Sequence, residues 1–277
     1  MTPAGGRRAA PIAIVVLLGA PEVLAESEPT FVNYEWTGSV PHGKIVTVTN
    51  VYGDVRARFG GYEDKVEVIG IIQHEPGADP RLAVSCLESK DGVTISVAPV
   101  GDAPVSLPNR VDLTVMVPDG APLHAEVRDG LIETKGLRGD IECRARNGQI
   151  RIRSGFGGVV AQTDQGLVDV VLDPFDAAKP KLVTSTYGEV AVHIPEIADA
   201  TVIAGTSGEI TTDFSVEIEH RKDQEPDKVA RARIGKGGQE VRIQNKQGKV
   251  KILSLQKVFV GTKDAAGSSH ETDTDTD

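Results

Sequence analysis

Aromatic residues are scarce in this chain of 277 residues, which contains one Trp, four Tyr and six Phe. Enzymes that cleave carbohydrates usually stack aromatic side chains on sugar rings, so the scarcity argues against that class. A carbohydrate-active β-helix enzyme nevertheless stays open as an alternative, because two catalytic carboxylates could come from segments that are distant in the sequence.

Cysteine is also scarce. Cys86 and Cys143 are too few for a small disulfide scaffold, although an oxidising compartment would permit a bridge between them. Cys143 stands in phase with Ile141 and Ala145, so we expect it to be a small core side chain.

Motifs for catalysis and metal binding are missing. Neither cysteine has a nearby His, no G-x-S-x-G occurs, and the six histidines lack the spacing of metal ligands. Aspartate follows a turn glycine only at Asp54 and Asp140, so calcium cannot occupy successive corners. We therefore predict a protein that is not an enzyme and has no catalytic residue, metal or cofactor.

Long apolar runs are absent beyond the N-terminus. There, Arg7 and Arg8 precede the apolar run of residues 9–20, and Ala25 places a small residue before "ESEPT". This pattern predicts a secretory signal peptide over 1–25 and no membrane span in the mature chain. We expect the exported protein to be periplasmic, cell-surface or extracellular.

Positive charge is in deficit, since 30 basic residues face 40 acidic residues. Removal of residues 1–25 leaves a net charge of −11. Such an acidic chain is not expected to bind nucleic acid through bulk electrostatics.

Glycine, in contrast, is abundant and regularly placed. Gly130, Gly148 and Gly166 are eighteen residues apart, and so are Gly139 and Gly157. Between them the sequence alternates apolar and polar residues, which predicts strands with one small apolar face. We expect the glycines to supply positive φ at corners. The full set of predicted turn glycines is Gly53, Gly130, Gly139, Gly148, Gly157, Gly166, Gly188, Gly208 and Gly248.

Two all-β architectures fit these nine-residue units. One is an antiparallel β-meander, because Asn-Gly and Asp-Gly favour hairpins. The other, which we favour for the small inward residues, is a β-solenoid with two strands per coil. We predict a less regular N-terminal β segment of the same domain over 31–109, solenoid repeats over 110–260, and a disordered acidic tail over 261–277. The 40 residues from Gly208 to Gly248 are interpreted as two coils, the first interrupted by a charged loop.

Five segments in this order resemble a known family of bacterial exported proteins, the putative adhesin domain family of unknown function. They are "YEWTGSVPHGKIVTVTNVYGDVRA", "DGVTISV", "VDLTVMVPDGAPL", the run of G-x-[IV] turns, and "IGKGGQEVRIQNKQGKVKI". The resemblance covers about residues 33–255 and implies a right-handed β-solenoid. It brings no catalytic residues.

The stretch "RGDIECRARNGQIRIR" is the most basic part of the repeats. Gly139 belongs to the glycine series, so we interpret Arg138-Gly139-Asp140 as a corner and not as an adhesion ligand. Four arginines are predicted to point outward and form a candidate contact face: Arg144, Arg146, Arg151 and Arg153.

These features together favour an exported, non-enzymatic, adhesin-like interaction module at the cell surface or envelope. Its partner would be an unknown protein or a surface glycan. An alternative is a periplasmic regulatory or assembly accessory that binds another protein.

The export prediction can be checked on the protein that cells secrete. We expect its intact mass to correspond to a chain that begins at Glu26, because signal peptidase cleaves after small residues such as Ala25. A protein that keeps residues 1–25 would contradict the predicted signal peptide.

Overall fold

The protein is all-β, as predicted, in the part that the computed structural model describes: residues 28–102, 105–153, 156–173, 175–176 and 178–255. These residues form nineteen strands and no helix, and the sheet does not close on itself. None of the described residues forms a helix able to cross a membrane. The predicted signal peptide and acidic tail lie outside the described residues.

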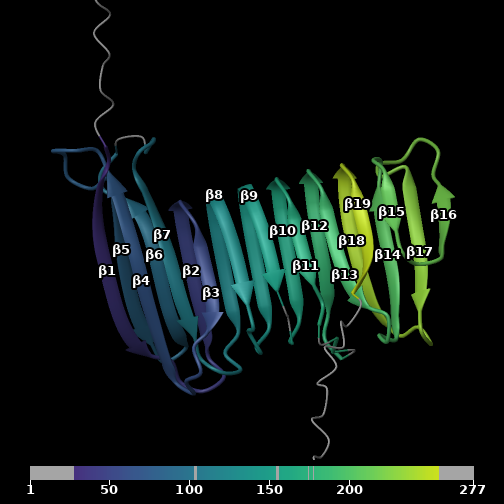
Figure 1. The fold of residues 1–277 in the computed structure, drawn as a ribbon, viewed down its shortest axis with the longest axis horizontal. Coiled ribbons are helices and arrows are strands. Elements are labelled where there is room, and N and C mark those ends of the chain that lie inside the picture. The colour runs from purple at the N-terminus through teal and green to yellow at the C-terminus, as the bar shows by residue number, and fades with distance from the viewer. Residues whose placement is uncertain (1–27, 103–104, 154–155, 174, 177, 256–277) are drawn as a thin grey trace, which may run out of the picture.

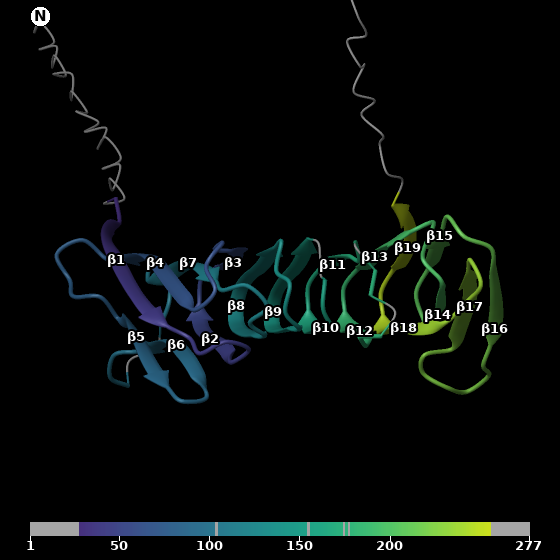
Figure 2. The same ribbon diagram turned by 90° about the horizontal axis from the view of Figure 1, so that it is seen from below.

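The strands form two hydrogen-bonded ladders, which Figure 2 shows as two layers of an elongated body (Figures 1 and 2). Ladder 1 consists, in spatial order, of β5 (Leu82–Ser89), β6 (Gly92–Pro99), β2 (Ile45–Tyr52), the first part of β8 (Leu123–Lys135), the first part of β9 (Ile141–Arg153), β10 (Val159–Gln165), β12 (Lys181–Tyr187), β18 (Gln239–Gln247), β14 (Ala200–Thr206), β17 (Lys228–Ile234) and β16 (Val216–His220). Ladder 2 consists of β1 (Thr30–Ser39), β4 (Lys65–His74), β7 (Arg110–Val117), β3 (Val55–Phe59), the second parts of β8 and β9, β11 (Val168–Val171), β13 (Val190–Pro195), β19 (Val250–Leu255) and β15 (Ile210–Thr212).

Successive repeats pair side by side and in parallel. Ala125 of β8 lies opposite Cys143 of β9, which lies opposite Ala161 of β10, an offset of eighteen residues at each step. Alternate side chains of each strand point inward, and these three are fully buried. The alternative of an antiparallel meander is therefore wrong for these repeats.

Antiparallel strands occur at the two ends of the stack. β5 at one end of ladder 1, and β1 and β4 at the same end of ladder 2, run antiparallel to their neighbours. At the other end, β16 and β17 extend ladder 1 in the same way.

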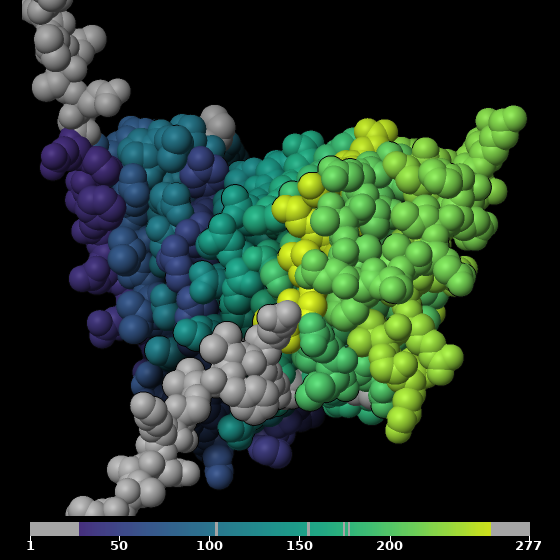
Figure 3. Space-filling model, turned by 45° about the vertical axis from the view of Figure 1, so that its right-hand side comes forward, coloured from purple at the N-terminus to yellow at the C-terminus, as the bar shows by residue number. Residues whose placement is uncertain are grey.

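The chain does not stack its coils in sequence order near the C-terminus. The interpretation of residues 208–248 as two successive coils is wrong, because β18 lies between β12 and β14, and β19 lies between β13 and β15. Figure 3 shows these last strands as a yellow strip within the green surface. The predicted charged loop is in part the antiparallel pair β16–β17, which follows the outermost coil.

The core between the ladders is built from small and β-branched residues. Val48, Ala125, Ile150 and Val170 are fully buried, and the cluster extends along the whole stack. Cys143 is buried in this core, whereas Cys86 is half-buried, and both are free thiols. The permitted Cys86–Cys143 bridge is therefore not formed in the structure.

The corner glycines are required for two different reasons. Gly166 has a φ of 136°, which confirms the predicted positive φ at that corner. The φ of Gly148 lies outside the left-handed region, so the prediction that Gly148 supplies positive φ is wrong. A Cβ on Gly148 would lie 2.0 Å from the carbonyl oxygen of Gly130 in the preceding coil. The same holds at four other corners, where φ also lies outside that region and an added Cβ would lie 1.9–2.4 Å from a backbone carbonyl oxygen of the neighbouring coil: Gly139, Gly157, Gly208 and Gly248.

Replacing Gly148 with Val should lower the free energy of unfolding by about 3–5 kcal/mol, because the carbonyl that a side chain would strike belongs to the backbone and cannot move aside. Urea denaturation measures the loss. Gly43→Ala is the control, since Gly43 has a φ of 71° and no atom within 4 Å of the added Cβ, and it should cost about 1–2 kcal/mol. A Gly148 variant as stable as the Gly43 variant would contradict the stacking argument.

Candidate functional site

The four predicted contact arginines point outward but do not form one face. β9 passes from ladder 1 to ladder 2 at Gly148, so Arg144 and Arg146 lie on the outer face of ladder 1. Arg151 and Arg153 lie on the outer face of ladder 2. The candidate face is therefore divided between the two layers, because the corner at Gly148 lies between the two pairs of arginines.

The Arg138-Gly139-Asp140 motif is occupied by contacts within the fold. The Asp140 carboxylate accepts the backbone N–H of Gly158 at 2.7 Å, and this bond together with the Lys179 ammonium lowers the pKa of Asp140. The Arg138 guanidinium is paired with Asp119 at 3.1 Å. It also lies over the ring of Phe59, 5.1 Å from the ring centroid. These contacts agree with a corner of the stack.

The outer face of ladder 1 presents a row of polar side chains in register. Arg144, Gln162, Thr184 and Gln244 are direct neighbours on β9, β10, β12 and β18. Neighbouring strands lie about 4.8 Å apart, so the row offers one hydrogen-bonding side chain per strand spacing. Two hollows share Thr184 and Thr186 of this face, with volumes of about 420 and 480 Å³.

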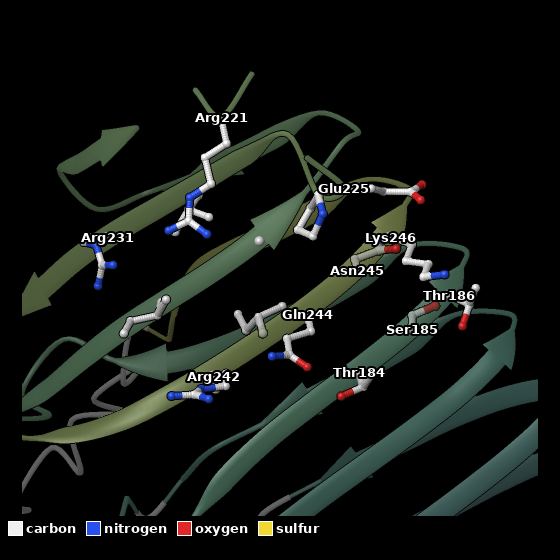
Figure 4. Close-up of a pocket in the computed structure, with 15 residues that line it drawn as sticks. Thr184, Ser185, Thr186, Arg221, Glu225, Arg231, Arg242, Gln244, Asn245 and Lys246 are labelled. Carbon is white, nitrogen blue, oxygen red and sulfur yellow. The ribbon is translucent and has the colours of Figure 1, made fainter. Parts of the chain in front are cut away.

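The larger hollow is a cleft between the ladder and the segment that joins β16 to β17 (Figure 4). Its floor includes Ile203 of β14 and Gln244 of β18, and Pro226 lies above. A Cβ on Gly205 would lie 3.0 Å from Pro226 Cγ, so the glycine makes room for this segment against β14.

Hydrogen bonds fix the segment over the strands. The backbone N–H of Arg221 donates to Asp227 O at 2.6 Å, and the N–H of Asp227 donates to Ser207 Oγ at 3.2 Å. Gln247 Nε2 donates to Glu225 Oε1 at 3.0 Å. The cleft is therefore defined by contacts within the chain.

The charge of the cleft is opposite to that of the protein. The cleft is lined by one acidic residue, Glu225, and by four basic residues: Arg221, Arg231, Arg242 and Lys246. Arg221 is 3.4 Å from Glu219, and Arg242 is paired with Glu240. In the described part of the chain, Arg231 and Lys246 have no carboxylate within ion-pair distance. The cleft can thus attract and bind an anionic group.

The cleft was not predicted from the sequence, because its basic residues come from segments that are not neighbours in the repeat pattern. Only the order of the strands brings β17 beside β14, and β18 between β14 and β12. The available signal was the outward basic residues of "KVARARI" and "QEVRIQNKQ", both of which lie within the 40 residues between Gly208 and Gly248.

The described residues include no metal-binding cluster, and both thiols have raised pKa values. Among the described residues, no three His, Cys, Asp or Glu side chains are placed to bind a metal ion. Burial raises the pKa of the Cys143 thiol far above its usual range. Burial also raises the pKa of Cys86, whose Sγ lies 3.4 Å from the Tyr34 hydroxyl. Neither thiol is thus activated as a nucleophile.

One carboxylate on the outer face of ladder 2 is strongly perturbed. His193 Nε2 lies 3.2 Å from Asp169 Oδ1, and Arg153 Nη2 lies 2.6 Å from Oδ2. The His193 ring and then the Arg153 guanidinium lower the pKa of Asp169 to about 2, despite its partial burial. Asp169 of β11 thus links Arg153 of β9 with His193 of β13, so these contacts connect three neighbouring strands of ladder 2.

No protein-family model and no curated protein matches the chain. Two solved structures are similar to it. One is described as a putative cell adhesion protein from Clostridium sporogenes ATCC 15579, with 15% identity, a TM-score of 0.44, and coverage of 82% of this chain and 100% of that one. The other is described as a putative adhesin from Bacteroides fragilis NCTC 9343, with 9% identity, a TM-score of 0.25, and coverage of 83% and 99%. At these values the likeness establishes neither a family nor a function, so the predicted family membership stays a prediction.

Replacing Asp169 with Asn should lower the free energy of unfolding by about 1 kcal/mol at pH 7, since the ion pairs are partly exposed. The folded pKa of about 2 lies below the ordinary value of 3.8, so this contribution is present above pH 3.8 and is lost as the pH falls towards 2. Urea denaturation of both proteins at pH 7, 4 and 2.5 measures the difference. Asp164→Asn, at an exposed carboxylate, is the control and should change stability little. A difference for Asp169→Asn that stayed constant over this range would contradict the assignment.

Proposed function

We propose that the protein is an exported, non-enzymatic, right-handed β-solenoid that acts as an adhesin-like interaction module of the cell surface or envelope. It binds its partner through the outer face of ladder 1. The observation that carries the proposal is the polar row of this face, which leads into a preformed basic cleft. Stacked strands position these side chains rigidly, and a rigid surface loses little entropy when it binds.

A binding role is favoured over hydrolysis by the residues of the cleft. Glycoside hydrolases use two carboxyl groups on either side of the scissile bond. Of the described residues that line the cleft, one, Glu225, has a carboxylate, and it accepts a hydrogen bond from Gln247. The lining offers charge and hydrogen bonds and lacks a second carboxyl group for acid–base chemistry.

The proposal is tested by the retention of the exported protein on envelopes of the cells that produce it. Thr184→Trp should reduce retention at least about tenfold, because Thr184 lines both hollows of ladder 1 and the indole would obstruct them where they meet. Thr211→Trp is the matched control, since it places the same side chain on β15 of ladder 2, away from the polar row. Both variants should keep the melting temperature within a few degrees of the parent protein.

Two results would count against the proposal. Equal retention of the two variants would exclude ladder 1 as the binding face. Recovery of the protein from the cytoplasm, with residues 1–25 still attached, would exclude the export on which the proposal depends.

A further inference from the structure

Three arginines from three separate elements converge on the cleft. Arg242 of β18 and Arg231 of β17 stand on either side of Ile203 in the strand register, and Arg221 comes from the segment that follows β16. Figure 4 shows the Arg221 side chain extending from that segment towards the strands that carry Arg231 and Arg242. The strand order thus gathers three guanidinium groups around one cleft of a protein that is acidic as a whole.

The chemistry of guanidinium groups defines the anion that this cleft would bind. A guanidinium binds a planar carboxylate or a phosphate through two parallel hydrogen bonds, in a geometry that Lys cannot reproduce. Among the described residues no carboxylate lies within ion-pair distance of Arg231, although Glu217 is opposite it in strand register, so the Arg231 donors are available to a ligand.

The remaining lining selects a ligand that also has many hydroxyl groups. Thr184 and Thr186 provide hydroxyls, Gln244 provides an amide, and Ile203 and Val229 provide apolar contact. The cleft volume of about 480 Å³ is within the range of small-ligand sites. The polar row continues from Thr184 to Gln162 and Arg144, so a chain of linked sugar units could extend along it.

An acidic peptide fits the cleft less well. Peptides that add to a sheet bind through main-chain hydrogen bonds to a free strand edge. The strands below the cleft have no free edge, because β18 is paired with β12 and β14, and β14 is paired with β18 and β17. Recognition here must use side chains, which favours a ligand with hydroxyl and carboxylate groups of its own.

We propose that the cleft between ladder 1 and the segment joining β16 to β17 binds a carboxylate-bearing saccharide through Arg221, Arg231 and Arg242. This ligand class rests on the proposed function and specifies the partner of the same face.

Calorimetric titration of the exported protein with tetragalacturonate and with tetramannuronate tests the proposal. We expect at least one of them to bind, at least about tenfold more tightly than its methyl ester, since esterification removes the charge and keeps the hydroxyls. Binding should weaken as the salt concentration rises. Arg231→Gln and Arg242→Gln should each reduce affinity at least about tenfold.

Arg151→Gln is the matched control because it removes an outward arginine of ladder 2, and it should leave the affinity unchanged. Thermal melts of all three variants should show that they remain folded. A saccharide that binds the parent protein but is insensitive to the two cleft substitutions would overturn the assignment of the site.

The other outcomes also decide the question. Equal binding of acid and ester would overturn the role of the carboxylate. An oligoglutamate that bound as tightly, with the same dependence on Arg231 and Arg242, would overturn the saccharide in favour of an acidic peptide. If neither uronate bound while Thr184→Trp still abolished retention on envelopes, the ligand class would be wrong and the proposed binding face would stand.

Discussion

The close approach of backbones at the glycine corner is the constraint on which the rest of the structure depends. Each coil places a glycine against the carbonyl oxygen of its neighbour, from Gly53 and Gly130 to Gly188 and Gly248, at distances that leave no space for a Cβ atom. Strands on both sides of the corner are thereby brought to pairing distance. The same approach leaves carbonyl groups buried at the corner, and a buried carbonyl needs a donor. Asn245 Nδ2 donates to Gly188 O at 2.8 Å, and Thr206 Oγ1 donates to Gly248 O at 2.7 Å. Polar side chains therefore occupy inward positions at the corner, whereas apolar ones fill the centre.

The stacking contact does not require that neighbouring coils be consecutive in the sequence. Gly248 lies against Gly188, and Gly208 lies against Gly248, so the last coil occupies the place between two earlier ones. This order leaves β14 outermost among the coils of ladder 1, and its outer edge pairs with β17. The segment between β16 and β17 can then fold back across β14 and β18, which makes the cleft. The binding site that we propose is thus a consequence of the strand order at this end of the stack.

The all-β class and the position of the repeats could be predicted from the sequence because both are local properties. The alternation in "IECRARNGQIRIR" already shows that Cys143 and Ile150 face inward and that Arg144 and Arg151 face outward, as the burial of these residues shows. The period also indicates which residues become neighbours, as with Ala125 and Cys143. The predicted corner at Gly148 with two strands per coil already implied that Arg144 and Arg146 lie on a different layer from Arg151 and Arg153, so a single face of four arginines was inconsistent with the predicted fold. Periodicity alone could not show the order of the last coils, because the sequence of β18 is equally suited to stacking on β12 or on β14.

The geometry of this stack explains how a protein with a net negative charge can hold a basic cleft. Outward side chains of neighbouring strands are in fixed register, so charges that alternate along one strand become rows across several strands. The row through Ile203 contains Arg231 and Arg242, with Glu217 of β16 opposite Arg231, whereas Glu240 falls in the next row, beside Thr201. Backbone pairing fixes the relative positions of Arg231 and Arg242, which cannot change by moving one strand alone. The anion that we propose for the cleft would therefore meet side chains whose strands are already in place, and for that reason the rigidity of the stack favours binding over a conformational response.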